Sequence, residues 1–129
     1  MKERVKDCVS MLRKDASRNV GVGEIAAKLE GMALQAFAES RAGGTRIVAG
    51  DLVKVAELMV VGAEVLGKSG NKKSQAYALS HAGKAYMEAG WMLEGKVLIE
   101  KATRMFLELG ILDQALNDSI YAGIKCNVI

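Results

Sequence analysis

Hydrophobic and polar positions alternate with a helical period over most of the chain. From residue 52 onward, apolar residues recur at spacings of three and four, and charged residues fall between them. The stripes occupy four consecutive segments and consist of Leu52, Val55, Met59, Gly62 and Leu66, then Ala76, Leu79, Ala82, Gly83 and Tyr86, then Trp91, Gly95, Leu98, Ala102, Met105 and Leu109, and finally Leu112, Ala115, Leu116 and Ile120. Each stripe predicts an amphipathic helix with one face toward a core.

Glycines divide these segments at a fixed interval. Gly50, Gly70, Gly90 and Gly110 are twenty residues apart, and each stands between two stretches of helical period. Glycine is suited to the turn after a helix, and residues such as Asp51 and Asn71 are suited to cap the next one. The spacing therefore predicts helices joined by short turns, with consecutive helices antiparallel.

Other glycines fall inside the predicted helices. A glycine there costs about 1 kcal/mol relative to alanine, so Gly62, Gly83 and Gly95 need a reason. We expect them where neighbouring helices approach closely, with a large side chain such as Tyr86 or Trp91 filling the space beside them.

The N-terminal part has a similar pattern. Residues 5–16 and 25–37 predict two further helices, which make a helix pair of residues 1–42, and residues 43–50 are expected to be a loop. The chain has 129 residues and no proline, as suits one domain of uninterrupted helices. We predict an all-α domain spanning 1–129, with about six antiparallel helices in an up-and-down array or bundle, and helical hairpins from 51 to 129.

The C-terminal half resembles a known repeat family. Six residues between 76 and 122 match the small and aromatic positions of tetratricopeptide repeats, namely Leu79, Gly83, Tyr86, Gly90, Gly95 and Ala102. The twenty-residue helix spacing is more similar to the longer repeats of the soluble NSF attachment protein group. Gly95 stands where the family prefers alanine, and the closing proline is absent. The resemblance implies a protein that binds proteins through the inner face of stacked hairpins.

This reading favours a non-catalytic adaptor or a subunit of an assembly. Hydrophobic residues make up 50% of the chain and 14 glycines come in addition, a surplus over ordinary composition that fits either tight helix packing or a patch covered by a protein partner or a second copy. Tyr77, Lys84 and Trp91 are the candidate contacts, because they are polar-tipped or aromatic and are expected near one end of two adjacent helices. Burial in the core is the alternative for each of them.

A second hypothesis uses the basic residues. The net charge is +3, and residues 68–84 hold four lysines and no acid. An accessory protein that binds nucleic acid or another anion would use Lys68, Lys72, Lys73, His81 and Lys84. Aromatic residues are only 5% of the chain, which argues against the stacking of bases.

Two short motifs have plainer explanations. The string GAEVLGKS at residues 62–69 fits the phosphate-loop pattern, but it continues a helical stripe where that motif needs a strand followed by a loop. We interpret Gly67, Lys68 and Ser69 as the end of a helix and expect no cofactor. The last four residues fit a prenylation signal at Cys126, although Asn127 is a poor match to its first aliphatic position.

Catalytic chemistry has little support in the sequence. The single histidine, His81, offers neither a metal cluster nor a triad, and Cys8 occupies an apolar helical position. An enzyme remains an alternative, because a helical domain can assemble a site from distant residues. The first residues form no apolar signal, and no uncharged run approaches the length of a membrane span, so we expect a cytoplasmic protein.

Overall fold

The computed structural model of the chain describes residues 6, 9–11, 13, 14, 27, 31 and 49–127. All of these lie in helices or in the short turns between helices, and this part of the chain contains no strand. The predicted all-α fold is therefore confirmed. No described helix is both long and apolar enough to cross a membrane.

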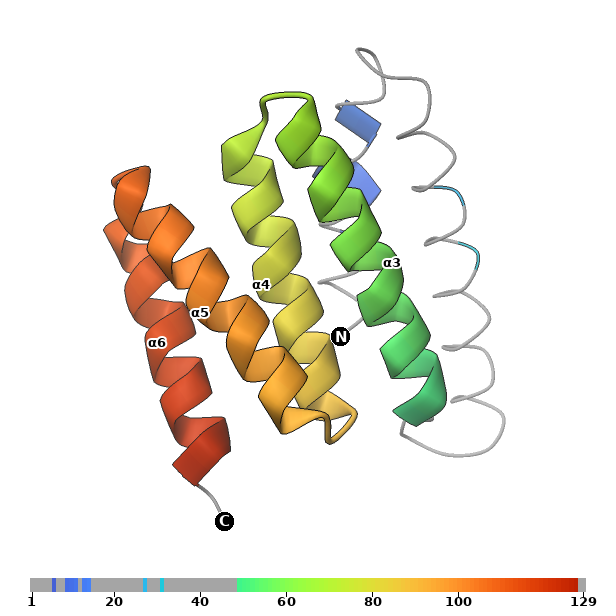
Figure 1. Cartoon of the computed structure of the whole chain (residues 1–129), viewed down its shortest axis with the longest axis vertical. Coiled ribbons are helices and arrows are strands. Elements are labelled where there is room, and N and C mark those ends of the chain that lie inside the picture. The colour runs from blue at the N-terminus through green and yellow to red at the C-terminus, as the bar shows by residue number, and fades with distance from the viewer. Residues whose placement is uncertain are drawn as a thin grey trace.

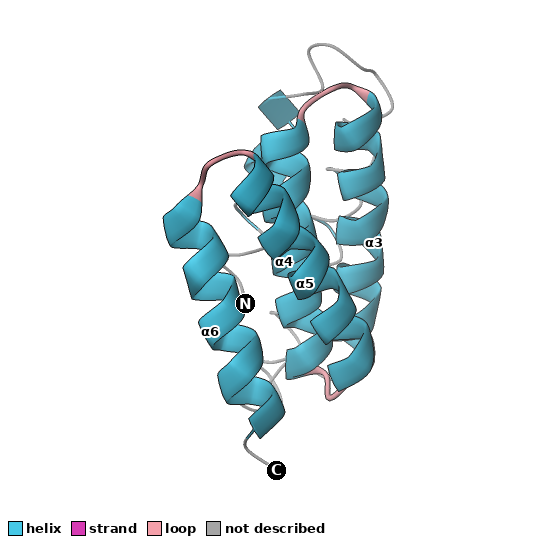
Figure 2. Cartoon of the chain, turned by 60° about the vertical axis from the view of Figure 1, so that its left-hand side comes forward, coloured by secondary structure: helices cyan, strands magenta, loops and turns pink. Residues whose placement is uncertain are grey.

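Four helices follow one another from residue 49 to residue 127. They are α3 (Ala49–Lys68), α4 (Lys72–Glu88), α5 (Met92–Glu108) and α6 (Leu112–Asn127). Each packs extensively against the next one along the chain. They form a row from α3 on the right to α6 on the left, with α6 partly behind α5 (Figure 1). The turns lie alternately at the upper and the lower ends of the helices, so neighbouring helices run antiparallel (Figure 2).

Glycine ends three of these helices in the same way. Gly70, Gly90 and Gly110 have φ angles of 86°, 90° and 76°, in the left-handed region that side chains with a Cβ rarely adopt. In each turn the glycine N–H donates to the carbonyl three residues earlier, and the next N–H donates to the carbonyl five residues earlier, at 2.8 to 3.1 Å. This is the Schellman motif, and it confirms the predicted turns at these three glycines.

The start of α3 differs from the prediction. Gly50 was expected to close a loop and Asp51 to cap the helix, but α3 already begins at Ala49, so both residues lie in its first turn. Alanine is the strongest helix former, and a single glycine weakens a helix without ending it. The cap predicted at Asn71 is confirmed, because its side chain accepts a hydrogen bond from the backbone N–H of Ser74 at 3.2 Å.

Little of the N-terminal region is described. The described residues before α3 are helical, and the helix pair of residues 1–42 stays a prediction. Val9 is buried and joins the core cluster formed with α3, α4 and α5. Cys8, the other residues of that pair and loop residues 43–48 lie outside the described residues.

The core follows the predicted stripes of α3 and α4. All five stripe residues of α3 are buried, and in α4 only Tyr86 is partly exposed. Phe106 of α5 is fully buried and belongs to the same core cluster as Met59 and Leu66 of α3. Helix α4 lies between α3 and α5 in the row, which explains why it buries eight residues despite its polar composition.

The stripe of α5 was correct at Gly95, Leu98, Ala102 and Met105 but not at its two ends, and the stripe of α6 was placed incorrectly. In α5 the buried residues are Gly95, Ile99, Ala102 and Phe106, while Trp91 and Leu109 from the predicted stripe are exposed. In α6 only Ala115 of the predicted stripe is buried, and the three large residues predicted with it are exposed. The face of α6 that packs inward instead carries small and polar residues, including Asp118. Helical period alone therefore identified an apolar face of α6, but not the face that packs.

Close packing at two interior glycines is confirmed. Gly83 of α4 and Gly95 of α5 lie against each other where the two helices meet. The side chains beside them are Ile99 and Met87, rather than the predicted Tyr86 or Trp91. The aromatic rings of Tyr86 and Trp91 stack on each other instead, with centroids 5.8 Å apart.

Candidate functional site

A buried carboxylate connects α6 to α4. Asp118 of α6 is 0% exposed, and its Oδ1 accepts a hydrogen bond from the Ser80 hydroxyl at 2.9 Å. The same oxygen forms an ion pair with Lys84 Nζ at 3.1 Å, and the lysine side chain is only 15% exposed. Ser80 and Lys84 are four residues apart, so α4 presents both on one face.

An aromatic ring completes this cluster. Lys84 Nζ lies 5.4 Å from the centre of the Tyr121 ring on α6, within the range of a cation–π interaction. Lys84 is therefore in contact with both a carboxylate and a ring of the same helix. The ammonium group balances the charge of Asp118, which would otherwise be costly to bury.

The chemistry open to these groups is limited by their burial. Ser80 is 3% exposed and its hydroxyl donates to Asp118, whose charge is balanced by Lys84, so the serine oxygen is poorly placed to reach a substrate. The second oxygen of Asp118, Oδ2, is also buried and accepts no hydrogen bond from the described residues. The arrangement is suited to fixing α6 against α4 rather than to attacking a substrate.

A polar hollow of about 380 Å³ adjoins this cluster. Its lining residues come from α4, α6 and the N-terminal region, and they are Ser10, Met11, Lys14, Tyr77, Ser80, His81, Lys84 and Gln114. Three residues predicted from the sequence, Tyr77, His81 and Lys84, therefore share one hollow. Two of the lining side chains, Lys14 and Lys84, are basic, and His81 lies in the same lining.

Tyr77 has a structural contact as well. Its ring meets Phe106 edge to face, with centroids 4.9 Å apart and planes at 71°. Burial, together with the negative charges of Asp113 and Asp118, raises the pKa of Tyr77 above its ordinary value of 10.0. Tyr77 therefore belongs partly to the core, the alternative foreseen for it.

The remaining predicted lysines lie elsewhere. Lys68, Lys72 and Lys73 are exposed around the turn between α3 and α4. Lys84 follows Lys72 by twelve positions in one helix, which separates them by about 18 Å. The basic residues predicted as one anion site are therefore two separate groups.

Trp91 is likewise far from Tyr77. It precedes α5 at the end of α4 opposite the α3–α4 turn and stacks on Tyr86, which lies about 14 Å along α4 from Tyr77. Tyr77, Lys84 and Trp91 do not share one end of two adjacent helices, so that part of the prediction is wrong. Tyr77 and Lys84 lie seven residues apart within α4, while Trp91 stands beyond the end of α4 as the N-cap of α5.

Trp91 borders an apolar hollow that the sequence did not suggest. Its ring, 45% exposed, stacks on Tyr86, and Tyr86 lines a hollow of about 420 Å³. The other lining residues come from α3 and α5, and they are Val60, Leu93, Glu94, Val97 and Leu98. Burial, with the charges of Glu57 and Glu94, raises the pKa of Tyr86. Leu93 and Val97 lie outside every predicted stripe, and their spacing of four was the only signal for this surface.

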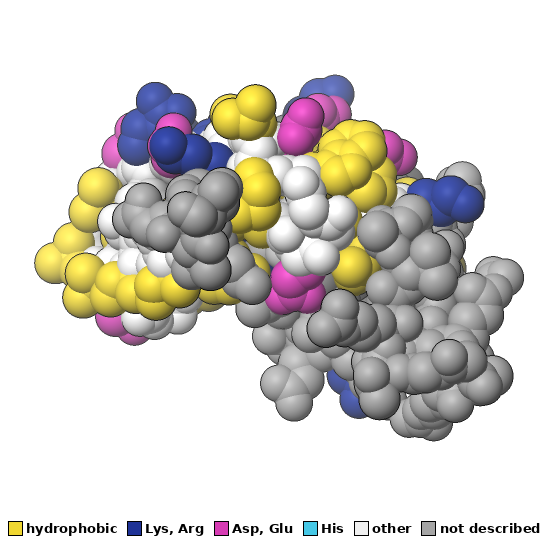
Figure 3. Space-filling model, turned by 90° about the horizontal axis from the view of Figure 1, so that it is seen from below, with side chains coloured by type: hydrophobic (Ala, Val, Ile, Leu, Met, Phe, Trp, Pro, Cys, Tyr) yellow, Lys and Arg dark blue, Asp and Glu magenta, His cyan; other side chains and the backbone are white. Residues whose placement is uncertain are grey.

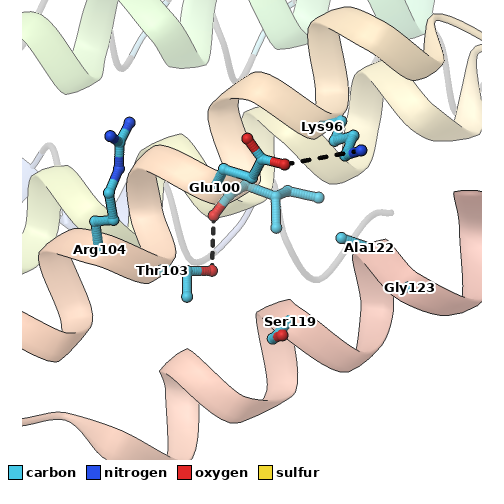
Figure 4. A pocket seen from close by; sticks show the side chains of 8 residues that line it. Lys96, Glu100, Thr103, Arg104, Ser119, Ala122 and Gly123 are labelled. Atoms are coloured by element: carbon cyan, nitrogen blue, oxygen red, sulfur yellow. Dashed lines mark hydrogen bonds and ion pairs between the residues drawn. The ribbon is translucent and has the colours of Figure 1, made fainter.

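A third hollow, of about 600 Å³, lies between α5 and α6 (Figure 4). Helix α5 contributes long polar side chains, among which Lys96 and Glu100 form an ion pair at 3.9 Å. Helix α6 contributes only small residues, Ser119, Ala122 and Gly123. We refer to this hollow below as the α5–α6 groove.

Both short motifs begin in the last part of a helix. Residues 62–68 belong to α3, and the Ser69 hydroxyl donates to the carbonyl of Leu66 at 2.9 Å. The stretch therefore has the form of a helix end and not of a phosphate loop. Cys126 lies in the last turn of α6, and the interpretation of its motif as a plain chain terminus rather than a prenylation signal stays a prediction.

Among the described residues, no three His, Cys, Asp or Glu side chains are grouped so that they could hold a metal ion. Comparison with known protein families, curated protein sequences and solved structures gives no match to this chain.

Proposed function

We propose that this chain is a protein-binding module, built from helical hairpins similar to tetratricopeptide repeats, that acts as a non-catalytic adaptor or subunit in the cytoplasm. Its helices pack in chain order and are joined by turns of one kind, an arrangement typical of hairpin arrays. Such arrays bind partners through extended surfaces formed by several helices.

The apolar hollow beside Trp91 carries this proposal. Leu93 and Val97 on its α5 side are 77% and 62% exposed, and an aromatic pair stands at its edge. Exposed aliphatic residues around a hollow with an aromatic pair at its edge have the composition of an interaction hot spot. Among the described residues of the lining, Glu94 alone is charged, so the expected ligand is an apolar side-chain cluster of another protein, such as one face of an amphipathic helix.

A capture experiment with matched variants tests the proposal. Tagged wild type, Leu93→Asp/Val97→Asp and Leu116→Asp would each be incubated with nuclease-treated native lysate, and bound proteins identified by mass spectrometry. Leu116 is a matched control, because it is 61% exposed, like Val97, but lies on α6. Circular dichroism would confirm that all three proteins are folded.

We expect a defined protein in near-equal amount with wild type and with Leu116→Asp, and its loss with Leu93→Asp/Val97→Asp. Equal recovery by all three would show that the hollow is not the binding surface. If wild type retained no protein and only nuclease-sensitive material, the proposed function would be wrong and the lysines would become the relevant residues.

A further inference from the structure

Four large aliphatic side chains form a ridge along the outer face of α6. Leu112, Leu116, Ile120 and Ile124 are 65%, 61%, 51% and 59% exposed. They are four residues apart and therefore follow one continuous row on the helix surface. Ala115 and Asp118, on the opposite side of the helix, are buried. Figure 3 shows hydrophobic side chains gathered along the left-hand side of the molecule, where α6 lies.

The α5–α6 groove runs beside this ridge. Ser119 and Gly123 line the groove and occupy the strip of α6 between the ridge and α5. A Cβ added at Gly123 would meet nothing within 4 Å, so the groove is open at this point. A ridge and a groove thus lie next to each other on one surface.

We infer that this surface binds the same surface of a second copy of the chain, with the two α6 helices antiparallel. A two-fold axis that passes between Leu116 and Ile120 places Leu116 of one copy opposite Ile120 of the other, and Leu112 opposite Ile124. Each ridge then enters the groove of the other copy, as ridges enter grooves between helices within one protein. Contacts of this kind are self-complementary and close into a dimer.

Charge and area are consistent with that pairing. Because α5 and α6 are antiparallel, Lys96 near the start of α5 lines the groove close to Gly123 near the end of α6. Asp113, in the first turn of α6, would approach Lys96 of the other copy. Two ridges with their groove walls would bury on the order of 1,000 Å², the area that a specific interface needs.

Analytical ultracentrifugation of the full chain tests the pairing. We expect wild type at concentrations on the order of 100 μM to sediment at twice the 13.8 kDa mass of one chain. Leu116→Asp should raise the dissociation constant by at least about 100-fold, because the symmetry places the charge at the interface twice. Val97→Asp, with similar exposure on α5, should leave the dimer unchanged.

Cross-linking tests the orientation without a disruptive charge. In a background with Cys8 and Cys126 replaced by serine, Leu112→Cys and Ile124→Cys proteins would be oxidised separately and as a mixture. An antiparallel pair should give disulfide-linked dimers mainly in the mixture. A wild type that remains monomeric at this concentration, dissociation by Val97→Asp instead of Leu116→Asp, or cross-linking within each separate protein would overturn the inference.

Discussion

Gly83 of α4 and Gly95 of α5 lie so close together that neither position has room for a Cβ atom. A Cβ at Gly83 would lie 2.8 Å from the carbonyl oxygen of Gly95, and a Cβ at Gly95 would lie 2.6 Å from the carbonyl oxygen of Gly83. Both obstacles are backbone atoms of a helix, which cannot rotate away as a side chain can. The close contact of α4 and α5 therefore depends on both glycines.

Alanine at either position should destabilise the protein. We expect Gly83→Ala and Gly95→Ala each to lower the free energy of unfolding by about 1–3 kcal/mol, because the helices must move apart. This loss should outweigh the gain of about 1 kcal/mol from the higher helix propensity of alanine. Urea unfolding followed by circular dichroism measures the change.

Gly67→Ala is the control for this prediction. A Cβ there also meets close atoms, but these belong to the end of the Gln75 side chain, which can rotate away. Gly67 lies within α3, so alanine should leave stability unchanged or raise it. Equal losses at positions 67, 83 and 95 would remove the close-packing explanation.

The glycine turns should be sensitive for a different reason. At Gly90 and Gly110 an added Cβ would meet nothing within 4 Å, so only the positive φ opposes a side chain. Gly90→Ala and Gly110→Ala should each cost about 1 kcal/mol, with a smaller cost for asparagine. Thermal and urea unfolding would test this, and an alanine without effect would show that the turn adopts another conformation.

Removal of only one partner from the ion pair of Lys84 and Asp118 should strongly destabilise the protein. Lys84→Met leaves a buried carboxylate unpaired and should lower the free energy of unfolding by about 3–5 kcal/mol. The double variant with Asp118→Leu should lose less than the sum of the single changes, and a double-mutant cycle measures this coupling.

Lys96 and Glu100 provide the comparison for that cycle. Their side chains are 49% and 58% exposed, so replacing both with glutamine should give a coupling below about 0.5 kcal/mol. A coupling between Lys84 and Asp118 that is no larger than this would mean that their pair does not hold α6 in place.

We expect the protein to lose stability at high pH because two tyrosines are partly buried. Burial raises the pKa of Tyr77 and of Tyr86, so the folded state holds these phenol protons more tightly than the unfolded state. Stability should therefore be complete below about pH 10 and fall as the pH rises toward the folded-state pKa values. The double variant Tyr77→Phe/Tyr86→Phe should show a shallower decline than wild type in urea unfolding at pH 9–11. Identical slopes would contradict the prediction.

Local patterns predicted the helices and their turns well. The stripe from Leu52 to Leu66 fixed the buried face of α3, and the glycines at 70, 90 and 110 marked the turns, because both signals depend only on nearby residues. Gly50 was misread because the strong helix former Ala49 precedes it. The twenty-residue interval was taken to mark a turn at Gly50, although α3 has already begun at Ala49.

Relationships between distant helices could not be predicted in this way. Asp118 stands between Asn117 and Ser119 like a surface residue, and its burial depends on Ser80, 38 positions earlier. The face of α6 was assigned from its largest apolar residues, although the small Ala115 marks the side that packs. Asp118 follows Ala115 by three positions and lies on the same face of the helix. This carboxylate could have indicated a buried ionic contact, because a charge on a packing face needs a partner.

The packing of each helix on its chain neighbours also determines how the molecule would respond to mechanical force. Tension applied through the C-terminal end would load the contacts of α6 with α5 one turn at a time, as in unzipping, rather than shearing many contacts together. The first firm resistance would come when the peeling reached Asp118. Because the contacts are local, the released helix should dock again quickly once the tension is removed.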